Sequence, residues 1–213
     1  MTENQRYLYV LFSATPYRMG RIIRFVTGEP YNHVAIALDG DLQELYAFAR
    51  RYYHTPFYGG FVTEHPYRYH HNGSTAQIRL CRIPLSEEQW QKLQRRVAKM
   101  RAHPERYLYN HLSAMTALIH KKINVPYAFT CAEFTVSILQ ELGYSFSSKV
   151  FYTIGDIVER LSAYRYYDGD FPVPPEEDTV FFDRHPVRHP IFRSTRDLLR
   201  LFWRKARAVI LPA

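Results

Sequence analysis

Cysteine is scarce in this chain of 213 residues, which contains only Cys81 and Cys131. Two thiols in a chain of this size cannot form a disulfide framework, and neither stands in a CxxC motif or a Cys/His cluster with the spacing of a zinc site. The sequence therefore predicts no metal and no cofactor. At this length the chain can bury a core without covalent cross-links, and we interpret the cysteine usage as that of a reducing compartment.

Long apolar runs are also absent, since no segment approaches the length of a membrane span. Residues 1–6 are polar and lead directly into an apolar strand pattern, without the charged, apolar and small-residue regions of a secretion signal. Taken with the cysteine usage, this pattern leads us to expect a cytoplasmic protein.

The formal net charge of +8 is distributed unevenly along the chain. From Phe181 to the C-terminus, eight basic residues stand against two acidic ones, which gives this segment +6 and leaves +2 for the first 180 residues. The arginines lack the aromatic platform on which single-stranded nucleic acids stack, and no nucleic-acid-reading motif is present. We therefore expect no nucleic-acid partner.

The only linker-like stretch, Phe171–Pro175, divides the sequence into a domain over residues 1–170 and a Pro-containing, basic C-terminal segment over residues 171–213. Within that segment a helix is predicted from about Ser194 to Arg207, with arginines at i, i+4 and i+8 on one side and apolar residues largely away from them. Such a helix can pack on its own domain or lie on an anionic membrane surface. We favour packing, because apolar helices are usually covered, and keep the membrane surface as a possible partner.

The clearest local signal is the stretch from Thr130 to Leu142, which predicts a single helix. Thr130 and Glu133 have the spacing of a capping box, in which the threonine hydroxyl accepts from the N3 amide and the glutamate accepts from the N-cap amide. Cys131 then occupies the first helical position, where the positive end of the helix dipole favours a thiolate. The alternative, and the more common case for a cysteine, is a small buried apolar residue that follows a cap.

A β-hairpin is predicted around Asp39-Gly40, because both flanking segments have strand character and Asp-Gly is a strong signal for a two-residue turn. With that turn, Tyr46 lies directly opposite His33, and Glu44 lies diagonally next to the histidine on the same face. His33 would then have a hydroxyl and a carboxylate within reach. A structural histidine satisfied by a neighbour would give the same pattern.

The remaining elements are predicted from apolar periodicity and turn residues. A strand over residues 7–13 precedes a helix that starts at Thr15 and buries Ile22, Ile23 and Val26. Residues 50–74, rich in Tyr, His, Gly and Pro, indicate a long ordered loop, and a loop of that length within a compact domain is usually functional. The other expected elements are a strand over 76–83 and helices over 86–100, over 107–121 and after Thr153.

A cysteine at a helix N-terminus and a histidine on a strand are the catalytic pair of papain-type enzymes. Here the histidine precedes the cysteine, which is the reverse of the papain order. In this respect the chain resembles the circularly permuted NlpC-type branch of the papain-fold superfamily, which includes YiiX-like proteins and relatives of lecithin:retinol acyltransferase. The resemblance rests on residues 32–36, 45–47 and 129–134, and it covers roughly residues 7–168.

The resemblance implies an α+β, papain-like fold in which a small antiparallel sheet packs against helices, with a catalytic domain over residues 1–170. It implies that Cys131 is the nucleophile, that its backbone amide is an oxyanion donor, and that His33 is the general base. The family carries His, Glu, Gln or Asn at the third position, whereas this chain has Tyr46. Glu44 is therefore a second candidate for orienting the His33 ring.

On this basis we expect a cysteine hydrolase of the amidase, peptidase or acyl hydrolase type. The expected substrate is an amide or ester of peptide, cell-wall or lipid origin. The alternative is a non-catalytic ligand-binding module on the same fold.

Overall fold

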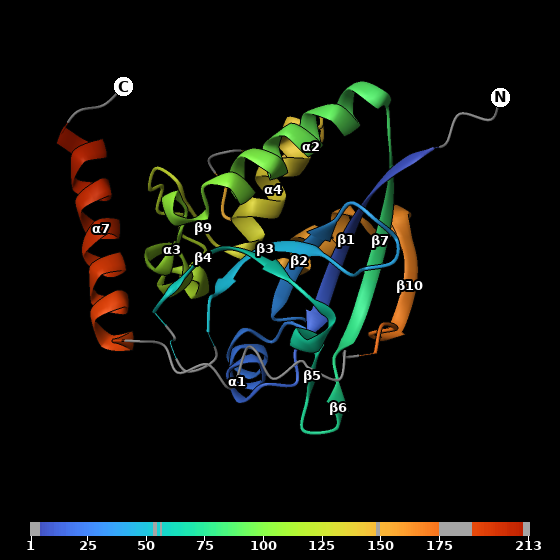
Figure 1. Cartoon of the computed structure of the whole chain (residues 1–213), viewed down its shortest axis with the longest axis horizontal. Coiled ribbons are helices and arrows are strands. Elements are labelled where there is room, and N and C mark those ends of the chain that lie inside the picture. The colour runs from blue at the N-terminus through green and yellow to red at the C-terminus, as the bar shows by residue number, and fades with distance from the viewer. Residues whose placement is uncertain (1–4, 53–54, 56, 148–149, 175–188, 211–213) are drawn as a thin grey trace.

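The computed structural model describes residues 5–52, 55, 57–147, 150–174 and 189–210, which form a mixed α+β fold (Figure 1). In this part of the chain the main sheet has eight strands in the order β10-β7-β1-β2-β3-β4-β8-β9, and all neighbours are antiparallel except β8 and β9. A separate ribbon pairs β5 with β6. The strands are β1 (Arg6–Ala14), β2 (His33–Ala37), β3 (Leu45–Arg50), β4 (Gly59–Glu64), β5 (His70–His71), β6 (Ser74–Thr75), β7 (Gln77–Leu85), β8 (Leu108–Tyr109), β9 (Ala128–Phe129) and β10 (Arg165–Asp170).

Helices cover one face of the sheet and its ends. Helix α4 contacts β2 and β3, while α2 contacts β1, β4 and β7. The helices are α1 (Arg18–Thr27), α2 (Glu87–Ala102), α3 (His111–Met115), α4 (Cys131–Glu141), α5 (Ile154–Arg160) and α7 (Pro190–Ile210). In this part of the chain no helix is both long enough and apolar enough to cross a bilayer.

Strand alternation divides the buried apolar residues between two cores. Val34 and Ile36 of β2 join the larger core beneath α2 and α4, whereas Ala35 and Ala37 join a second core on the opposite face. Phe171 also belongs to the second core, where its ring stacks on Tyr69 with 4.4 Å between the ring centroids. The start of the expected linker is therefore packed on the domain, and its last residue, Pro175, lies outside the described residues.

Several predicted elements are confirmed, and the cause of each is visible in its cap. Thr130 and Glu133 make both hydrogen bonds of the capping box at the start of α4, and Ser86 with Gln89 does the same for α2. Such a cap contributes about 1 kcal/mol to helix stability. The predicted helix after Thr153 is α5 and begins with the same type of cap.

The predicted two-residue hairpin at Asp39-Gly40 is wrong. Residues 38–44 all lie between β2 and β3, and Tyr46 pairs with Ile36 rather than with His33. Leu42 explains the longer connection, because it adopts a left-handed backbone with φ of 56° and is buried in the second core. Burial of this leucine side chain stabilises the longer connection.

Helix α1 also differs from its prediction, since Ile22, Ile23 and Val26 are exposed instead of forming a core side. Its buried residue is Gly20, where an added Cβ would lie 2.9 Å from Asn32 Nδ2. The helix therefore approaches the sheet through a small residue and presents its larger apolar side chains to solvent.

Two segments that we predicted as single elements each contain several short ones. The expected helix over 107–121 is the short strand β8 followed by α3 and a single helical turn. The expected loop over 50–74 contains β4, the turn over Pro66–Tyr69 and the β5–β6 ribbon.

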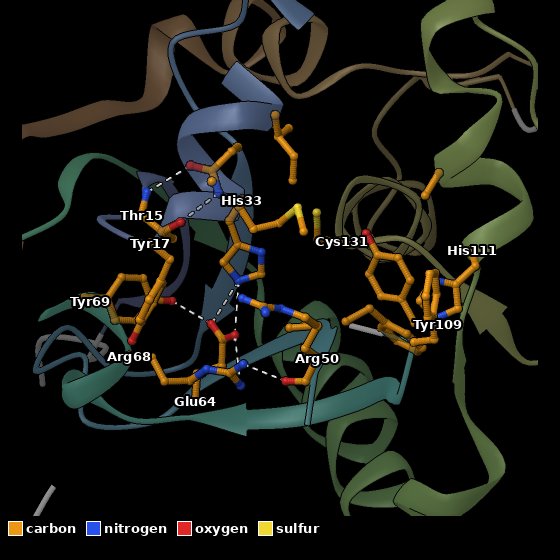
Figure 2. A pocket seen from close by; sticks show the side chains of 18 residues that line it. Thr15, Tyr17, His33, Arg50, Glu64, Arg68, Tyr69, Tyr109, His111 and Cys131 are labelled. Atoms are coloured by element: carbon orange, nitrogen blue, oxygen red, sulfur yellow. Dashed lines mark hydrogen bonds and ion pairs between the residues drawn. The ribbon is translucent and has the colours of Figure 1, made fainter. Parts of the chain in front are cut away.

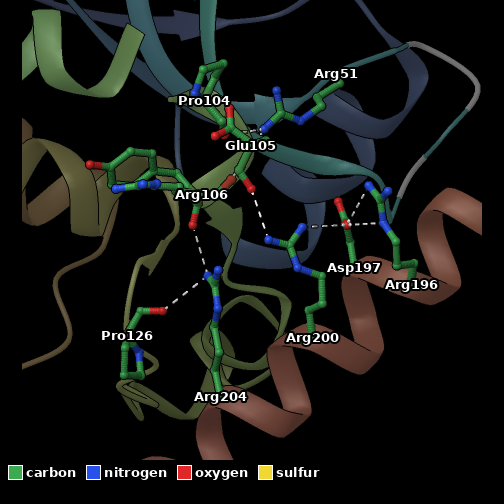
Figure 3. A network of polar contacts seen from close by, with 10 residues as sticks. Arg51, Pro104, Glu105, Arg106, Pro126, Arg196, Asp197, Arg200 and Arg204 are labelled. Atoms are coloured by element: carbon green, nitrogen blue, oxygen red, sulfur yellow. Dashed lines mark hydrogen bonds and ion pairs between the residues drawn. The ribbon is translucent and has the colours of Figure 1, made fainter. Parts of the chain in front are cut away.

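Helix α7 packs on the domain, as predicted, but through its basic side (Figure 3). Arg200 donates a hydrogen bond to the carbonyl oxygen of Glu105, and Arg204 donates one to that of Arg106. Among the side chains of this helix whose burial is described, Leu201 is the apolar one that is buried. The apolar side that we expected to be covered faces outward, with Phe192, Leu199, Phe202, Trp203 and Val209 exposed.

Candidate active site

Cys131 is held at the first position of α4 by a buried polar network. The Glu133 carboxylate accepts from the Thr130 amide at 2.8 Å and is also bonded by Asn110 and Ser113. These contacts fix the first turn from outside the helix as well as from within it. The Glu133 amide of this turn donates to Thr130 Oγ1, whereas the amides of Cys131 and Ala132 stand at positions that have no partner within an α-helix and can donate to a negative group beside Cys131.

His33 is the first residue of β2, and the residue before it is anchored to the end of β1. The Thr15 amide donates to Asn32 Oδ1 at 2.9 Å, and Asn32 Nδ2 donates to Thr15 Oγ1 at 2.8 Å. This exchange fixes the backbone from which the His33 ring projects. The ring lies between Cys131 and Glu64 (Figure 2).

Glu64, the last residue of β4, is the carboxylate that meets the histidine. Its Oε2 lies 3.0 Å from His33 Nε2. β3 lies between β2 and β4 in the sheet but runs at a steep angle to β2, and this angle brings the end of β4 to the beginning of β2 (Figure 1). Tyr69 donates a hydrogen bond to the same carboxylate at 2.7 Å, and Arg68 lies 3.3 Å from its other oxygen.

This environment stabilises the charged forms of both partners. Burial alone would lower the pKa of His33, but the adjacent Glu64 carboxylate and Cys131 outweigh burial and raise that pKa from 6.5 to about 10. Burial alone would raise the pKa of Glu64, but His33, Arg68 and the hydrogen bond from Tyr69 lower it to about 2. The pair is therefore an imidazolium and a carboxylate at neutral pH, and with Nε2 on Glu64 the ring presents Nδ1 to Cys131.

Neither predicted orienting residue reaches the histidine. The Tyr46 hydroxyl donates to Glu44 at 2.8 Å, and Arg101 contacts both side chains. Burial and the hydrogen bond to Glu44 raise the pKa of Tyr46 to about 12, so it stays a neutral donor. The expected pairing of His33 with Tyr46 and Glu44 is wrong because it depended on the two-residue turn, which the chain does not form.

Sequence reasoning did not identify Glu64, Arg68 or Tyr69, although all three fall within the loop region that its length marked as functional. A more specific signal was available in Gly59-Gly60-Phe61-Val62-Thr63-Glu64. In this segment two glycines precede a short run of aromatic and β-branched residues that ends on a carboxylate.

Tyr109 stands on the other side of Cys131 (Figure 2). Burial, together with the neighbouring Cys131 and Glu133, raises the pKa of its phenol well above the ordinary value, so the hydroxyl keeps its proton. Gly59 permits this placement, because an added Cβ there would lie 2.9 Å from Tyr109 Cβ and 2.9 Å from the Ala49 carbonyl oxygen. A neutral hydroxyl therefore faces the thiol from the wall opposite His33.

Cys131, His33 and Glu64 line one cavity of about 330 Å³. Its lining also includes Arg50, Arg68, Tyr69, Tyr109 and His111, and the apolar side chains of Met19, Ile23, Phe48 and Phe57. The size is at the lower end of small-molecule sites, and the mixture of apolar walls with a few convergent polar groups is typical of them.

The other thiol, Cys81, lies in a different environment. It is fully buried and donates a weak hydrogen bond to the carbonyl oxygen of Leu161, with 3.6 Å between sulfur and oxygen. Burial raises the pKa of Cys81 to about 11, so its thiolate is disfavoured.

No metal centre stands beside this arrangement in the described ranges, where no group of three or more His, Cys, Asp and Glu residues is placed to hold an ion. A scan against protein-family models finds no match to the chain, and searches of curated proteins and of solved structures also find none.

Proposed function

We propose that this protein is a cysteine hydrolase of the amidase, peptidase or acyl hydrolase type, built on a circularly permuted papain-like arrangement. The observation that carries the proposal is the sequence of contacts from Glu64 through His33 to Cys131 at the N-terminus of α4. A nucleophile, a base and a group that orients the base are the three parts that thiol-dependent acyl transfer requires.

In the proposed reaction, the Cys131 thiolate attacks the carbonyl carbon of an amide or ester. The first-turn amide of Cys131 and the hydroxyl of Tyr109 donate to the oxyanion that forms. His33 gives its Nδ1 proton to the departing amine or alcohol as the bond to the carbonyl breaks, which leaves a thioester. Water then attacks the thioester, His33 takes its proton, and the Cys131 thiolate is released with a carboxylic acid.

Glu64 takes the third role in this proposal. Glutamate is a residue type that the resembled family uses to orient its histidine, although here it comes from β4 and position 46 keeps its tyrosine. The carboxylate holds the ring by Nε2 and stabilises the imidazolium, while Arg68 and Tyr69 hold the carboxylate.

The test is alkylation of the native protein by iodoacetamide at pH 6, followed by peptide mapping of both cysteines. We expect Cys131 to react about tenfold or more faster than glutathione, because an imidazolium and a helix N-terminus stabilise its thiolate, and Cys81 to remain unlabelled. p-Nitrophenyl acetate should transfer an acetyl group to Cys131, and water should then hydrolyse the resulting thioester.

The control separates activation from accessibility. His33→Ala leaves Cys131 where it is but removes the imidazolium, so its alkylation should fall to the glutathione rate or below. If Cys131 reacts no faster than glutathione in the unaltered protein, or if His33→Ala has no effect, the hydrolase is refuted. The site is then better described as a ligand-binding module.

We propose in addition that α7 rests on an anionic membrane surface. Its outward side combines Leu199 and Trp203, which are 65% and 58% exposed, with the exposed cations Arg196 and Arg207. The acidic residue of this helix, Asp197, is buried. An apolar stripe that contains tryptophan and is flanked by cations complements the boundary between anionic headgroups and acyl chains.

A further inference from the structure

The charged side chains of the candidate active site are already engaged within the protein. Arg68 lies 3.3 Å from Glu64 and donates a hydrogen bond to the carbonyl oxygen of Arg50, and both arginines make further contacts. His33 is paired with the same carboxylate. The part of a substrate that lies beyond the reacting carbonyl therefore meets mainly the uncharged lining of the cavity.

Helix α1 supplies an apolar part of this lining. Met19 and Ile23 stand four positions apart on one side of the helix, and both line the cavity. Their exposed fractions are 44% and 39%, so they border the cavity without being part of the core. An apolar surface in this position is stabilised when a ligand removes it from water.

Polar contacts hold α1 against the segment that carries His33. Arg24 donates a hydrogen bond to the carbonyl oxygen of Thr15 at 3.1 Å and another to Asn32 Oδ1. Gly20, which is buried, faces the same two residues, because a Cβ added there would overlap Thr15 Oγ1 and lie 2.9 Å from Asn32 Nδ2. Asn32 directly precedes His33 in the chain. The apolar part of the lining is thus anchored beside the histidine.

The position of α1 relative to the reaction follows from the two sides of the thiol. Tyr109 stands on the side of Cys131 away from His33 and is, with the Cys131 amide, the proposed donor to the oxyanion (Figure 2). His33 gives its proton to the departing amine or alcohol, so that group must lie within hydrogen-bond distance of its ring. Because α1 is anchored beside His33, its apolar side chains lie next to the departing group.

The apolar surface continues along α1 beyond the cavity. Ile22 and Val26, which are 56% and 53% exposed, stand with Met19 and Ile23 at the i, i+3, i+4 and i+7 positions of one helix face. A stripe of this extent is about 10 Å long, which exceeds the reach of one amino-acid side chain. An extended aliphatic chain matches the stripe better than a single apolar side chain does.

We propose that the group that departs from the substrate carries an unbranched apolar chain, and that Met19 and Ile23 bind this chain and determine the specificity for it. The substrate is then an ester or amide of an aliphatic alcohol or amine. The inference rests on the proposed hydrolase, because it assigns the substrate class of the same site.

The first test compares the hydrolysis of ethyl acetate with that of hexyl acetate, each rate divided by the rate of the same ester with hydroxide. A fully buried methylene changes a binding constant about fourfold, and against the partly exposed side chains of α1 we expect about twofold. The additional methylenes of hexyl acetate should therefore raise kcat/KM about tenfold. Ethyl hexanoate, an isomer of hexyl acetate that carries its chain on the acyl side, should show a smaller gain.

The double variant Met19→Gln/Ile23→Gln should lower the preference for hexyl over ethyl acetate to about twofold or less. Phe25→Gln is the matched control, because it makes the same kind of change on the same helix, at a ring that is 89% exposed and stands outside the described lining of the cavity. It should keep the preference. An unchanged preference in the double variant, or a preference for ethyl hexanoate that equals or exceeds that for hexyl acetate, would overturn the inference.

A second test does not depend on hydrolysis. Cys131→Ser removes the nucleophile, and the thermal stabilisation of this variant is measured with N-ethylacetamide and with N-hexylacetamide. We expect N-hexylacetamide to raise the melting temperature more than N-ethylacetamide does. Adding Met19→Gln/Ile23→Gln should abolish this difference, whereas adding Phe25→Gln should preserve it.

The two tests separate the inference from the proposed function. If the unaltered protein hydrolyses none of the esters, the hydrolase fails, and the stabilisation measurement alone decides whether α1 binds an apolar chain. Equal stabilisation by both amides refutes that role. If Met19→Gln/Ile23→Gln loses binding to anionic vesicles instead of the ester and amide preferences, the apolar side of α1 is a membrane contact and the inference is overturned.

Discussion

Replacing Glu64 with glutamine should destabilise the protein strongly and slow the chemistry of Cys131. The side chain is 2% exposed and interacts with His33, Arg68 and Tyr69, so the change leaves a buried imidazolium and a buried guanidinium without their carboxylate. The pKa of Glu64 falls from 4.5 to about 2 on folding, which corresponds to about 3 kcal/mol at ~1.4 kcal/mol per pH unit. The larger pKa change of His33 also includes the effect of Cys131, so the free energies that correspond to the two pKa changes are not added.

The pH dependence of this stabilisation follows from the directions of the two pKa shifts. Glu64 has a lowered pKa, so its contribution is present above about 4.5 and is lost as pH falls through about 2. His33 has a raised pKa, so its contribution is present below about 6.5 and is lost as pH rises through about 10. The stability difference between the unaltered protein and Glu64→Gln should therefore be largest from pH 4.5 to 6.5 and shrink on both sides.

Urea unfolding followed by circular dichroism across this pH range measures the difference. Glu44→Gln is the matched control, because it makes the same change in an ion pair with Arg101 whose side chains are 42% and 48% exposed. Such a pair contributes about 1 kcal/mol or less. The reasoning is refuted if both variants lose the same stability. It is also refuted if iodoacetamide alkylates Cys131 of Glu64→Gln as fast as Cys131 of the unaltered protein at neutral pH.

Two further predictions concern residues outside the catalytic contacts. Tyr46→Phe should leave the alkylation rate of Cys131 unchanged, because the Tyr46 hydroxyl bonds Glu44 rather than His33; a rate lowered about tenfold would restore Tyr46 as the orienting residue. The full chain should co-sediment with anionic vesicles at low salt, and a Leu199→Gln/Trp203→Gln variant should not; the control Phe25→Gln removes an exposed ring from α1 and should still bind. Binding that does not change in the α7 variant would exclude this helix as the membrane contact.

Local sequence signals were sufficient for part of the candidate site. Thr130 and Glu133 determine where α4 begins by satisfying each other's backbone amides, and this interaction needs only residues three positions apart. The position of Cys131 as the first residue of α4 follows directly from this cap. His33 was identifiable as a strand residue for a similar reason, because β2 is an unbroken apolar segment.

The partner of His33 could not be predicted in the same way. The turn rule at Asp39-Gly40 considers the loop alone, whereas burial of Leu42 in the second core lengthens the connection and moves Tyr46 opposite Ile36. A shift in register changes every cross-strand neighbour, so an error in one turn removed both expected orienting residues.

The sequence by itself determined the capped helix, the position of Cys131 within it and the amphipathic character of α7, because these depend on residues within a few positions of one another. Only the tertiary structure decided that Glu64 meets His33, since the contact joins the start of β2 to the end of β4, which are 31 residues apart in sequence and separated by β3 in the sheet. It also decided which side of α7 faces the domain. The backbone carbonyls of Glu105 and Arg106, which are distant from α7 in sequence, accept hydrogen bonds from its arginines (Figure 3). The basic side of α7 therefore faces the domain, and its apolar side faces outward.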